Sequence, residues 1–218
     1  MSNLDFSSMN KTLNDYFQKI YCVNLKKRLD RWELAKNQFN FHGIQVERYD
    51  AVDGTEHDRI GKMSHGEIGC LLSHLNILKH CKDNNISNVL IFEDDVEFDD
   101  NLNQLFFQYV EELPEWDLLY FGATHALCYP YMDRPPIKVT DHVYKVYNAH
   151  ATHAYAVNSS CYDILIDFVS KMEGPLDVIY TKLQAYLRTY VFRPHLAWQR
   201  NDYSDIAGKY VNYDFLKR

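Results

Sequence analysis

Two kinds of apolar pattern alternate along this chain. Short apolar runs rich in β-branched residues are typical of buried strands, and apolar residues that recur every three or four positions are typical of amphipathic helices. Strands are predicted at 20–25, 45–49, 89–92, 116–122, 144–147 and 152–157. Helices are predicted at 28–40, 64–82, 159–171 and 177–188. Gly43 and the Gly174-Pro175 pair provide helix breaks.

The order of these elements predicts an α/β fold. Strand, helix, strand at the beginning of the chain is a βαβ unit, whose strands pair in parallel. We find no internal repeat, low-complexity segment or Gly/Ser linker. The expected organisation is one domain over 1–218, with an N-terminal arm at 1–17 and a C-terminal loop, 191–218, that folds over the site.

Composition narrows the classes of partner. The chain has 218 residues, 46% of them hydrophobic, and a formal net charge of −7. The hydrophobic content excludes a disordered protein, and the acidic balance argues against a nucleic-acid surface, which needs a basic patch. An anionic ligand would have to be met by a bound cation or by a few arginines.

Cysteine usage and hydropathy indicate a protein without disulfides or membrane spans. The five cysteines are odd in number and lack C-x-x-C spacing, so neither a disulfide framework nor a zinc site is indicated. Cys22, Cys70 and Cys81 lie within apolar patterns and are expected in the core. No signal-peptide pattern and no run of 18 apolar residues is present, so we expect a cytoplasmic protein that can lie peripheral to a membrane.

Three consecutive acids, Glu93, Asp94 and Asp95, follow the apolar strand 89–92. Open α/β sheets bind ligands at the carboxyl ends of their strands, and a divalent cation there would be held by carboxylates. If the extended backbone continued, Glu93 and Asp95 would point to one side and Asp94 to the other. Solvated turn residues are the ordinary alternative for such a cluster.

Two further groups of residues can each be explained either by a structural role or by a functional one. Ser64 and Glu67 have the S-x-x-E spacing of a capping box, which explains them without a ligand. Asn24, Arg28 and Arg31 follow the first strand, where Arg31 would offer forked hydrogen bonds to phosphate or ribose. The alternative for Arg31 is a surface arginine in the first turn of a helix.

Four motifs occur in an order that resembles glycosyltransferase family 25, which includes lipooligosaccharide and procollagen galactosyltransferases. They are Val23-Asn24-Leu25 with Arg28 and Asp30-Arg31, Asp50-Ala51-Val52-Asp53-Gly54, Gly66-Glu67-Ile68-Gly69-Cys70-Leu71-Leu72-Ser73-His74, and Phe92-Glu93-Asp94-Asp95. The resemblance is specific over 20–98 and continues more weakly through 152–157, 175–177 and 204–206.

The resemblance implies a GT-A (Rossmann-like) nucleotide-sugar-binding fold with a mixed, mostly parallel central sheet flanked by helices. It also implies a UDP-sugar donor and Mn²⁺ or Mg²⁺. In such folds the last acid of a D-x-D motif binds the metal, so Asp95 is the first expected ligand and Glu93 the second. The residues expected around the nucleotide are Asn24, Arg28, Arg31, Ala51, Asp53, His74 and Asp94.

Inversion at the anomeric carbon is also implied by the resemblance. An inverting transferase needs a carboxylate on the acceptor side to take the hydroxyl proton. Asp177, after the Gly174-Pro175 break, is the candidate base, and a plain helix N-cap is the alternative. His150, His153 and His195 are candidates for a third metal ligand.

The sequence thus predicts a metal-dependent, inverting transferase of a hexose, galactose before glucose, from a UDP-sugar. The acceptor would be a glycan, a glycolipid or a hydroxylysine-type peptide. Two alternatives stay open: a non-catalytic nucleotide- or carbohydrate-binding module, and another metal-dependent phosphoryl enzyme such as a nucleotidyltransferase. The acceptor is expected to meet the irregular segments 129–140 and 191–218, which carry no readable specificity code.

Overall fold

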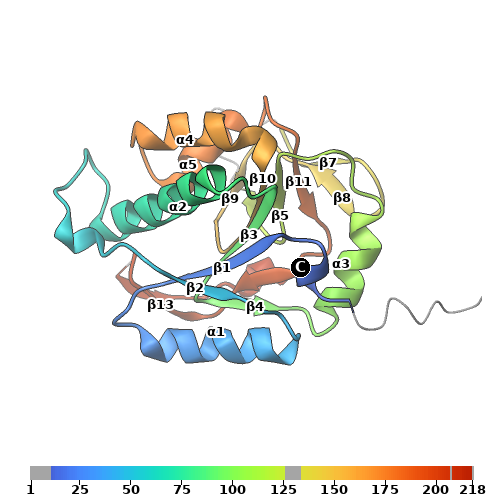
Figure 1. The fold of residues 1–218 in the computed structure, drawn as a ribbon, viewed down its shortest axis with the longest axis horizontal. Helices are drawn as coiled ribbons and strands as arrows, with labels where there is room; N and C mark the ends of the chain where they lie inside the picture. Colours follow the sequence, from blue (N-terminus) through green and yellow to red (C-terminus); the bar gives the residue numbers. More distant parts are fainter. Residues whose placement is uncertain (1–10, 126–133, 207, 218) are drawn as a thin grey trace, which may run out of the picture.

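A central eight-stranded sheet organises the molecule (Figure 1). The computed structural model describes residues 11–125, 134–206 and 208–217, so part of the predicted acceptor segment 129–140 lies outside the described residues. The strand order is β2-β1-β3-β10-β5-β11-β8-β7. Their bounds are β1 Lys19–Asn24, β2 Glu47–Asp50, β3 Asn88–Glu93, β5 Leu118–Tyr120, β7 Ile137–Lys138, β8 Val143–Lys145, β10 Ala154–Asn158 and β11 Thr189–Phe192.

The sheet is mixed, and most of its strands share one direction. β1 pairs in parallel with β2 and β3, and β5 pairs in parallel with β11. β10 is inserted antiparallel between β3 and β5, and β8 is antiparallel to β11 and β7. This arrangement confirms the predicted mixed, mostly parallel α/β sheet.

In the described part of the chain, five α-helices cover the two faces of the sheet. They are α1 Leu29–Phe41, α2 His65–Asp83, α3 Leu102–Val110, α4 Tyr162–Ser170 and α5 Leu176–Leu183. α2, α4 and α5 share one hydrophobic core with the sheet, and α1 and α3 share the other, on the opposite face (Figure 1). Side chains alternate along β3: Val89 and Ile91 lie in the first core, Leu90 and Phe92 in the second. β3 is therefore buried on both faces, as its continuous apolar run predicted.

Small elements complete the chain. The short strands are β4 Val96–Phe98, β6 Thr124–His125, β9 Ala149–His150, β12 Ala197–Gln199, β13 Asp202–Ser204 and β14 Lys209–Val211. The 3₁₀ helices are η2 Leu13–Asp15, η3 Gly54–Glu56, η4 Ser159–Cys161 and η5 Asp214–Leu216. No helix in the described residues is long and apolar enough to cross a membrane.

The structure adds detail to the predicted elements in three places. Helix α3 was not predicted, although Leu102, Phe106 and Tyr109 have helical spacing and are buried. The predicted C-terminal loop contains β12, β13 and β14, which pair with β4 or with each other. The described part of the predicted N-terminal arm packs against the body, because Leu13 and Phe17 are buried in the core.

The capping box at the start of α2 is confirmed. Ser64 is the N-cap and its Oγ accepts from the Glu67 amide at 3.2 Å, while the Glu67 carboxylate accepts from the Ser64 amide at 2.7 Å. These bonds satisfy two of the amides that a helix start leaves without intrahelical partners. The capping box also fixes where α2 begins, beneath the acidic cluster.

A buried carboxylate, Asp117, links the start of β5 to two other segments of the chain. Asp117, just before β5, accepts hydrogen bonds from the Arg188 amide and guanidinium at 2.7–3.0 Å and from Ser160 Oγ at 2.6 Å. Burial alone would raise the pKa of Asp117, but the hydrogen bonds from Arg188 and Ser160 lower it to about 2. Asp117 therefore stabilises the folded state while it is ionised.

We expect Asp117→Asn to lower the free energy of unfolding at pH 7 by about 2 kcal/mol, because each unit of pKa shift corresponds to about 1.4 kcal/mol. The folded pKa lies below the ordinary aspartate value of 3.8, so this stability is present above about pH 4 and is lost as the pH falls through about 2. Urea denaturation at several pH values measures both effects. Asp141→Asn is the control, because its ion pair with Lys138 is exposed. An equal loss in the two variants would contradict the assignment.

Candidate active site

The acidic cluster lies where β3 gives way to a turn. Glu93 is the last residue of β3, and Asp94 and Asp95 form the turn into β4. The extended backbone does not continue past Glu93, so the predicted division, with Asp94 facing away from Asp95, was wrong. Asp94 and Asp95 instead both contact Arg31, and Glu93 faces α2.

Arg31 joins the two aspartates. Its Nε lies 2.8 Å from Asp94 Oδ1 and its Nη2 lies 2.9 Å from Asp95 Oδ2. The Arg31 side chain is 9% exposed, and Asp205 Oδ2 from the C-terminal segment lies 3.8 Å from Nη1. The forked geometry predicted for phosphate or ribose is therefore directed at two carboxylates. Even so, burial raises the pKa of Asp94 to about 6, against the opposing charge of Arg31.

Asn24 supports the same turn from the end of β1. Its Nδ2 donates to Asp94 Oδ2 at 2.6 Å and to the Arg28 carbonyl at 3.0 Å, and its Oδ1 accepts from Arg48 Nε at 2.9 Å. The side chain is buried, and both of its polar atoms are hydrogen-bonded. Asn24 therefore positions Asp94.

Three other predicted nucleotide residues lie along the loops beside this turn. Arg28 pairs with Asp30 and Asp205. Asp53 caps η3 and pairs with Lys27, and the Ala51 amide donates to the Asn24 carbonyl at 3.0 Å. Each has a structural partner, and none of the three lines the pocket described next.

A pocket of about 260 Å³ brings the second predicted metal ligand, Glu93, together with the predicted base, Asp177. Asp95, the first predicted ligand, is not among the residues that line it. Glu93 enters from the end of β3 and Asp177 from the first turn of α5. The wall also includes residues from α2, from the segment before β10 and from the C-terminal segment. Among these wall residues are Cys70, Ala151, Thr152, Gln199 and Tyr213.

Asp177 is held by groups from the opposite wall. Its Oδ2 accepts from the Ala151 amide at 3.4 Å and lies 3.5 Å from His150 Nδ1. The predicted N-cap role was wrong: Pro175 is the N-cap of α5, and the carboxylate turns toward His150. Burial would raise the pKa of Asp177, but hydrogen bonds from His150 and from backbone amides bring it below the ordinary value. The carboxylate is therefore ionised at neutral pH.

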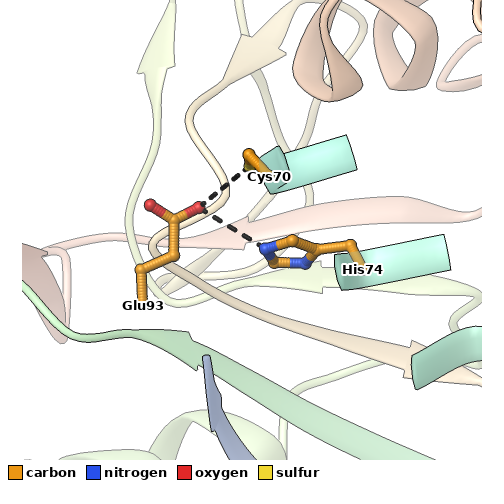
Figure 2. A group of neighbouring side chains, drawn as sticks. All are labelled: Cys70, His74 and Glu93. Atoms are coloured by element: carbon orange, nitrogen blue, oxygen red, sulfur yellow. Dashed lines mark hydrogen bonds and ion pairs between the residues drawn. The ribbon is translucent and has the colours of Figure 1, made fainter. Parts of the chain in front are cut away.

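Glu93 lies beside a hydroxyl, an imidazole and a thiol group. Its Oε1 accepts from Thr152 Oγ1 at 2.7 Å and lies 3.7 Å from His74 Nε2 and 4.0 Å from Cys70 Sγ (Figure 2). His74, expected near the nucleotide, is fully buried beneath the pocket. Burial, followed by the charge of Asp95, holds the pKa of Glu93 well above the ordinary glutamate value.

The three histidines expected as a third metal ligand have separate environments. His150 contacts Asp177, and His153 Nε2 lies 3.3 Å from the Ala197 carbonyl. His195 donates from Nδ1 to the Leu216 carbonyl and lines a second cavity. In the described residues the structure brings none of them into one ligand group with Glu93 or Asp95.

Asp95 has a carboxylate oxygen that is available to bind a cation. Its Oδ1 is buried and has no hydrogen-bond partner, whereas its Oδ2 contacts Arg31 and, at 3.4 Å, Gln199 Nε2. One guanidinium, that of Arg31, contacts two carboxylates, so the cluster keeps net negative charge when both aspartates are ionised. A hard divalent cation bound by carboxylate oxygens fits this imbalance.

Sequence reasoning missed several residues of the site. Cys70 was expected in the core but lines the pocket. Thr152, Gln199 and Tyr213 reach the pocket from segments remote in sequence. A signal existed for Cys70 and Thr152, because both lie within segments that resemble the family, whereas Gln199 and Tyr213 had none.

The model of one protein family, described as "Glycosyltransferase family 25 (LPS biosynthesis protein)", matches residues 17–179. That span runs from β1 into the first half of α5 and includes every residue considered so far at the acidic cluster except those of the C-terminal segment. The chain belongs to glycosyltransferase family 25. The predicted resemblance is thereby confirmed.

Several family 25 relatives match about half of this chain. A "Glycosyltransferase 25 family member" of Drosophila pseudoobscura pseudoobscura is 35% identical over 130 residues, which cover 47% of this chain and 20% of the relative. "Procollagen galactosyltransferase 2" of Mus musculus is 28% identical, with 49% and 21% covered. A "Probable inactive glycosyltransferase 25 family member 3" of Bos taurus is 27% identical, with 49% and 22% covered. The matched segments thus span about a fifth of these relatives.

We expect Arg31→Met to lower the free energy of unfolding by about 3–5 kcal/mol, because it leaves Asp94 and Asp95 buried without their cation. Chemical denaturation at pH 7 measures the loss. Arg28→Met is the matched control in the same helical turn. Its partners Asp30 and Asp205 are well exposed, so the expected loss is below about 1 kcal/mol. Similar losses in both variants would contradict the conclusion that the buried ion pairs of Arg31 stabilise the fold more than the exposed ion pairs of Arg28.

Proposed function

We propose that this family 25 chain is a metal-dependent, inverting glycosyltransferase. It transfers a hexose, galactose or glucose, from a UDP-sugar to a glycan, a glycolipid or a hydroxylysine-type peptide. The observation that carries the proposal is the shared pocket, in which Glu93 from the end of β3 and Asp177 from α5 are both wall residues. An inverting transfer needs a donor-side group and an acceptor-side carboxylate at one reaction centre.

On the donor side, Asp95 and Glu93 would hold the Mn²⁺ or Mg²⁺ ion. Such an ion offsets the charge that develops on a departing diphosphate. Asn24 and Arg31 keep the turn in place, so that Asp95 presents its unpartnered Oδ1. Without a cation the net charge of the cluster would repel the diphosphate.

On the acceptor side, Asp177 would take the proton of the attacking hydroxyl. Its lowered pKa keeps it ionised, and His150 and the Ala151 amide fix its orientation. Ala151 has a φ of 76°, in the left-handed region that non-glycine residues rarely occupy. Strained backbone of this kind clusters at functional sites, and here it aims an amide at Asp177.

A non-catalytic module is the second candidate. One relative, from Bos taurus, is named a probable inactive member, so family membership alone does not establish turnover. Both carboxylates needed for transfer are in place in this chain, which favours activity. A nucleotidyltransferase or similar phosphoryl enzyme would bind the same class of cation but would favour ATP over UDP.

With a panel of UDP-hexoses and a saccharide or hydroxylysine peptide acceptor, we expect UDP release that EDTA abolishes and Mn²⁺ restores. Asp95→Asn should lower kcat/KM by about 100-fold or more, since Lewis-acid stabilisation is worth several kcal/mol. Asp100→Asn is the control, an exposed aspartate after β4. Release that is indifferent to both EDTA and Asp95→Asn would rule out the metal role. Tight UDP binding without release would favour the module, and binding of ATP the phosphoryl enzyme.

Asp177→Asn should lower kcat by about 10²–10⁴-fold with little change in KM or UDP binding, because a general base acts in the transition state. For the wild type, the acidic limb of the rate profile should lie below the ordinary aspartate range. The contribution of Asp177 to the rate is then lost only as the pH falls through its lowered pKa. Asp167→Asn, an exposed aspartate on α4, is the control. Full activity of Asp177→Asn, or retained anomeric configuration by NMR, would contradict the mechanism.

A further inference from the structure

Cys70, His74 and Glu93 form a side-chain cluster in which only Glu93 has a role in the proposed reaction. Cys70 and His74 lie one turn apart on α2 and both face Glu93 at the end of β3 (Figure 2). One ligand atom from each residue, Sγ, an imidazole nitrogen and a carboxylate oxygen, lies within 4.8 Å of the others. In the described ranges it is the one group of three His, Cys, Asp or Glu side chains whose ligand atoms lie this close together.

His74 has an unexplained nitrogen in this cluster. The residue is fully buried, and its Nδ1 lies 2.8 Å from the Tyr155 hydroxyl. Its Nε2, which points to Glu93, has no hydrogen-bond partner. With the Nδ1 proton on the Tyr155 side, Nε2 carries a free lone pair. Metal-bound histidines are typically held in this way, with the second nitrogen fixed by a neighbouring group.

The separations are close to those of a tetrahedral site. Zinc bonds of about 2.0–2.2 Å to nitrogen or oxygen and about 2.3 Å to sulfur place tetrahedral neighbours about 3.4 Å apart for N and O, and about 3.6 Å apart for S and O. The corresponding distances here are 3.7 Å for His74 Nε2 to Glu93 Oε1 and 4.0 Å for Cys70 Sγ to the same oxygen. The third pair, Cys70 Sγ and the His74 nitrogen, lies within 4.8 Å. Side-chain shifts of up to about 1 Å would therefore close the site.

We infer that Cys70, His74 and Glu93 form a binding site for a zinc-class transition-metal ion. This site shares Glu93 with the proposed carboxylate site at Asp95 but adds a thiol and an imidazole. Thiolate and imidazole favour Zn²⁺, whereas carboxylate oxygens favour Mg²⁺ and Mn²⁺. A thiolate and a carboxylate together neutralise a divalent ion, so the bound site has no net charge in a buried place. The inference does not rest on the proposed transfer reaction, because it concerns the chain without nucleotide or sugar.

The pocket gives the ion a route and a fourth position. Cys70 and Glu93 both line it, so an ion can arrive from solvent without opening the core. A water or a ligand group in the pocket would complete four-coordination, as in zinc sites that keep an open position. The Thr152 hydroxyl, which donates to Glu93 Oε1, would orient the carboxylate from the far side.

The test is metal binding to the full chain, stripped of metal and kept reduced. Titration with Zn²⁺ by calorimetry, and with Co²⁺ by absorption, should give one ion per chain and a thiolate-to-cobalt charge-transfer band. Cys70→Ser and His74→Gln should each weaken binding by more than about tenfold, and Cys70→Ser should abolish the band. Tyr155→Phe should give a loss of about 10–100-fold, the usual effect of removing a group that orients a ligand. Cys81→Ser, a buried cysteine on α2 outside the cluster, is the matched control.

Several outcomes would overturn the inference. They are no binding by the wild type, a cobalt spectrum without the thiolate band, and binding that Cys70→Ser leaves unchanged. Circular dichroism without metal checks the fold of each variant. If His74→Gln does not fold, Cys70→Ser decides, because Cys70 is only partly buried and the change is nearly isosteric. UDP release lost in Asp95→Asn with zinc binding intact would separate this site from the proposed reaction.

Discussion

The contact of Arg31 with Asp94 and Asp95 is the interaction on which the site depends. A turn that places two carboxylates in a nearly dry position is unfavourable unless a cation accompanies them. Arg31 comes from α1, on the face of the sheet opposite α2, so the pairing also fixes α1 against the end of β3. Asp205 approaches the same guanidinium, which brings the C-terminal segment over the cluster. One side chain thereby links three segments remote in sequence.

The antiparallel strand β10 explains why Glu93 and Asp177 share a pocket. Because β10 runs opposite to β3, its beginning lies beside the end of β3, and Ala154 pairs with Phe92. The residues that precede β10 therefore lie next to Glu93, and Thr152 hydrogen-bonds to it. The same segment presents Ala151 to Asp177 on α5. A parallel strand in this position would have placed its carboxyl end there instead.

Local patterns predicted most of the fold, and contacts across the chain determined the rest. The apolar run of β3, the capping box at Ser64 and the helical spacing in α2 are local signals, and each is confirmed in the structure. The turn after Glu93 could not be predicted, because Arg31 stabilises it from another helix. The pairing of β12 with β4 has the same origin, since a short strand without periodicity forms only where a partner edge is available. Family resemblance supplied Asp177, but only the structure shows which carboxylates share a wall.

Pocket size adds a constraint to the proposed reaction. A volume of about 260 Å³ is slightly below the usual range of about 300–1,000 Å³ for ligand pockets, so it can hold only part of a nucleotide sugar. Glu93 and Asp177 are in its wall, so in the proposed reaction the pocket would hold the transferred sugar and the attacking hydroxyl. The nucleotide of the proposed donor would then extend outside, where the loops that carry Arg28, Ala51 and Asp53 lie beside the acidic turn. Their present ion pairs and backbone contacts would be the interactions that a bound nucleotide exchanges for its own.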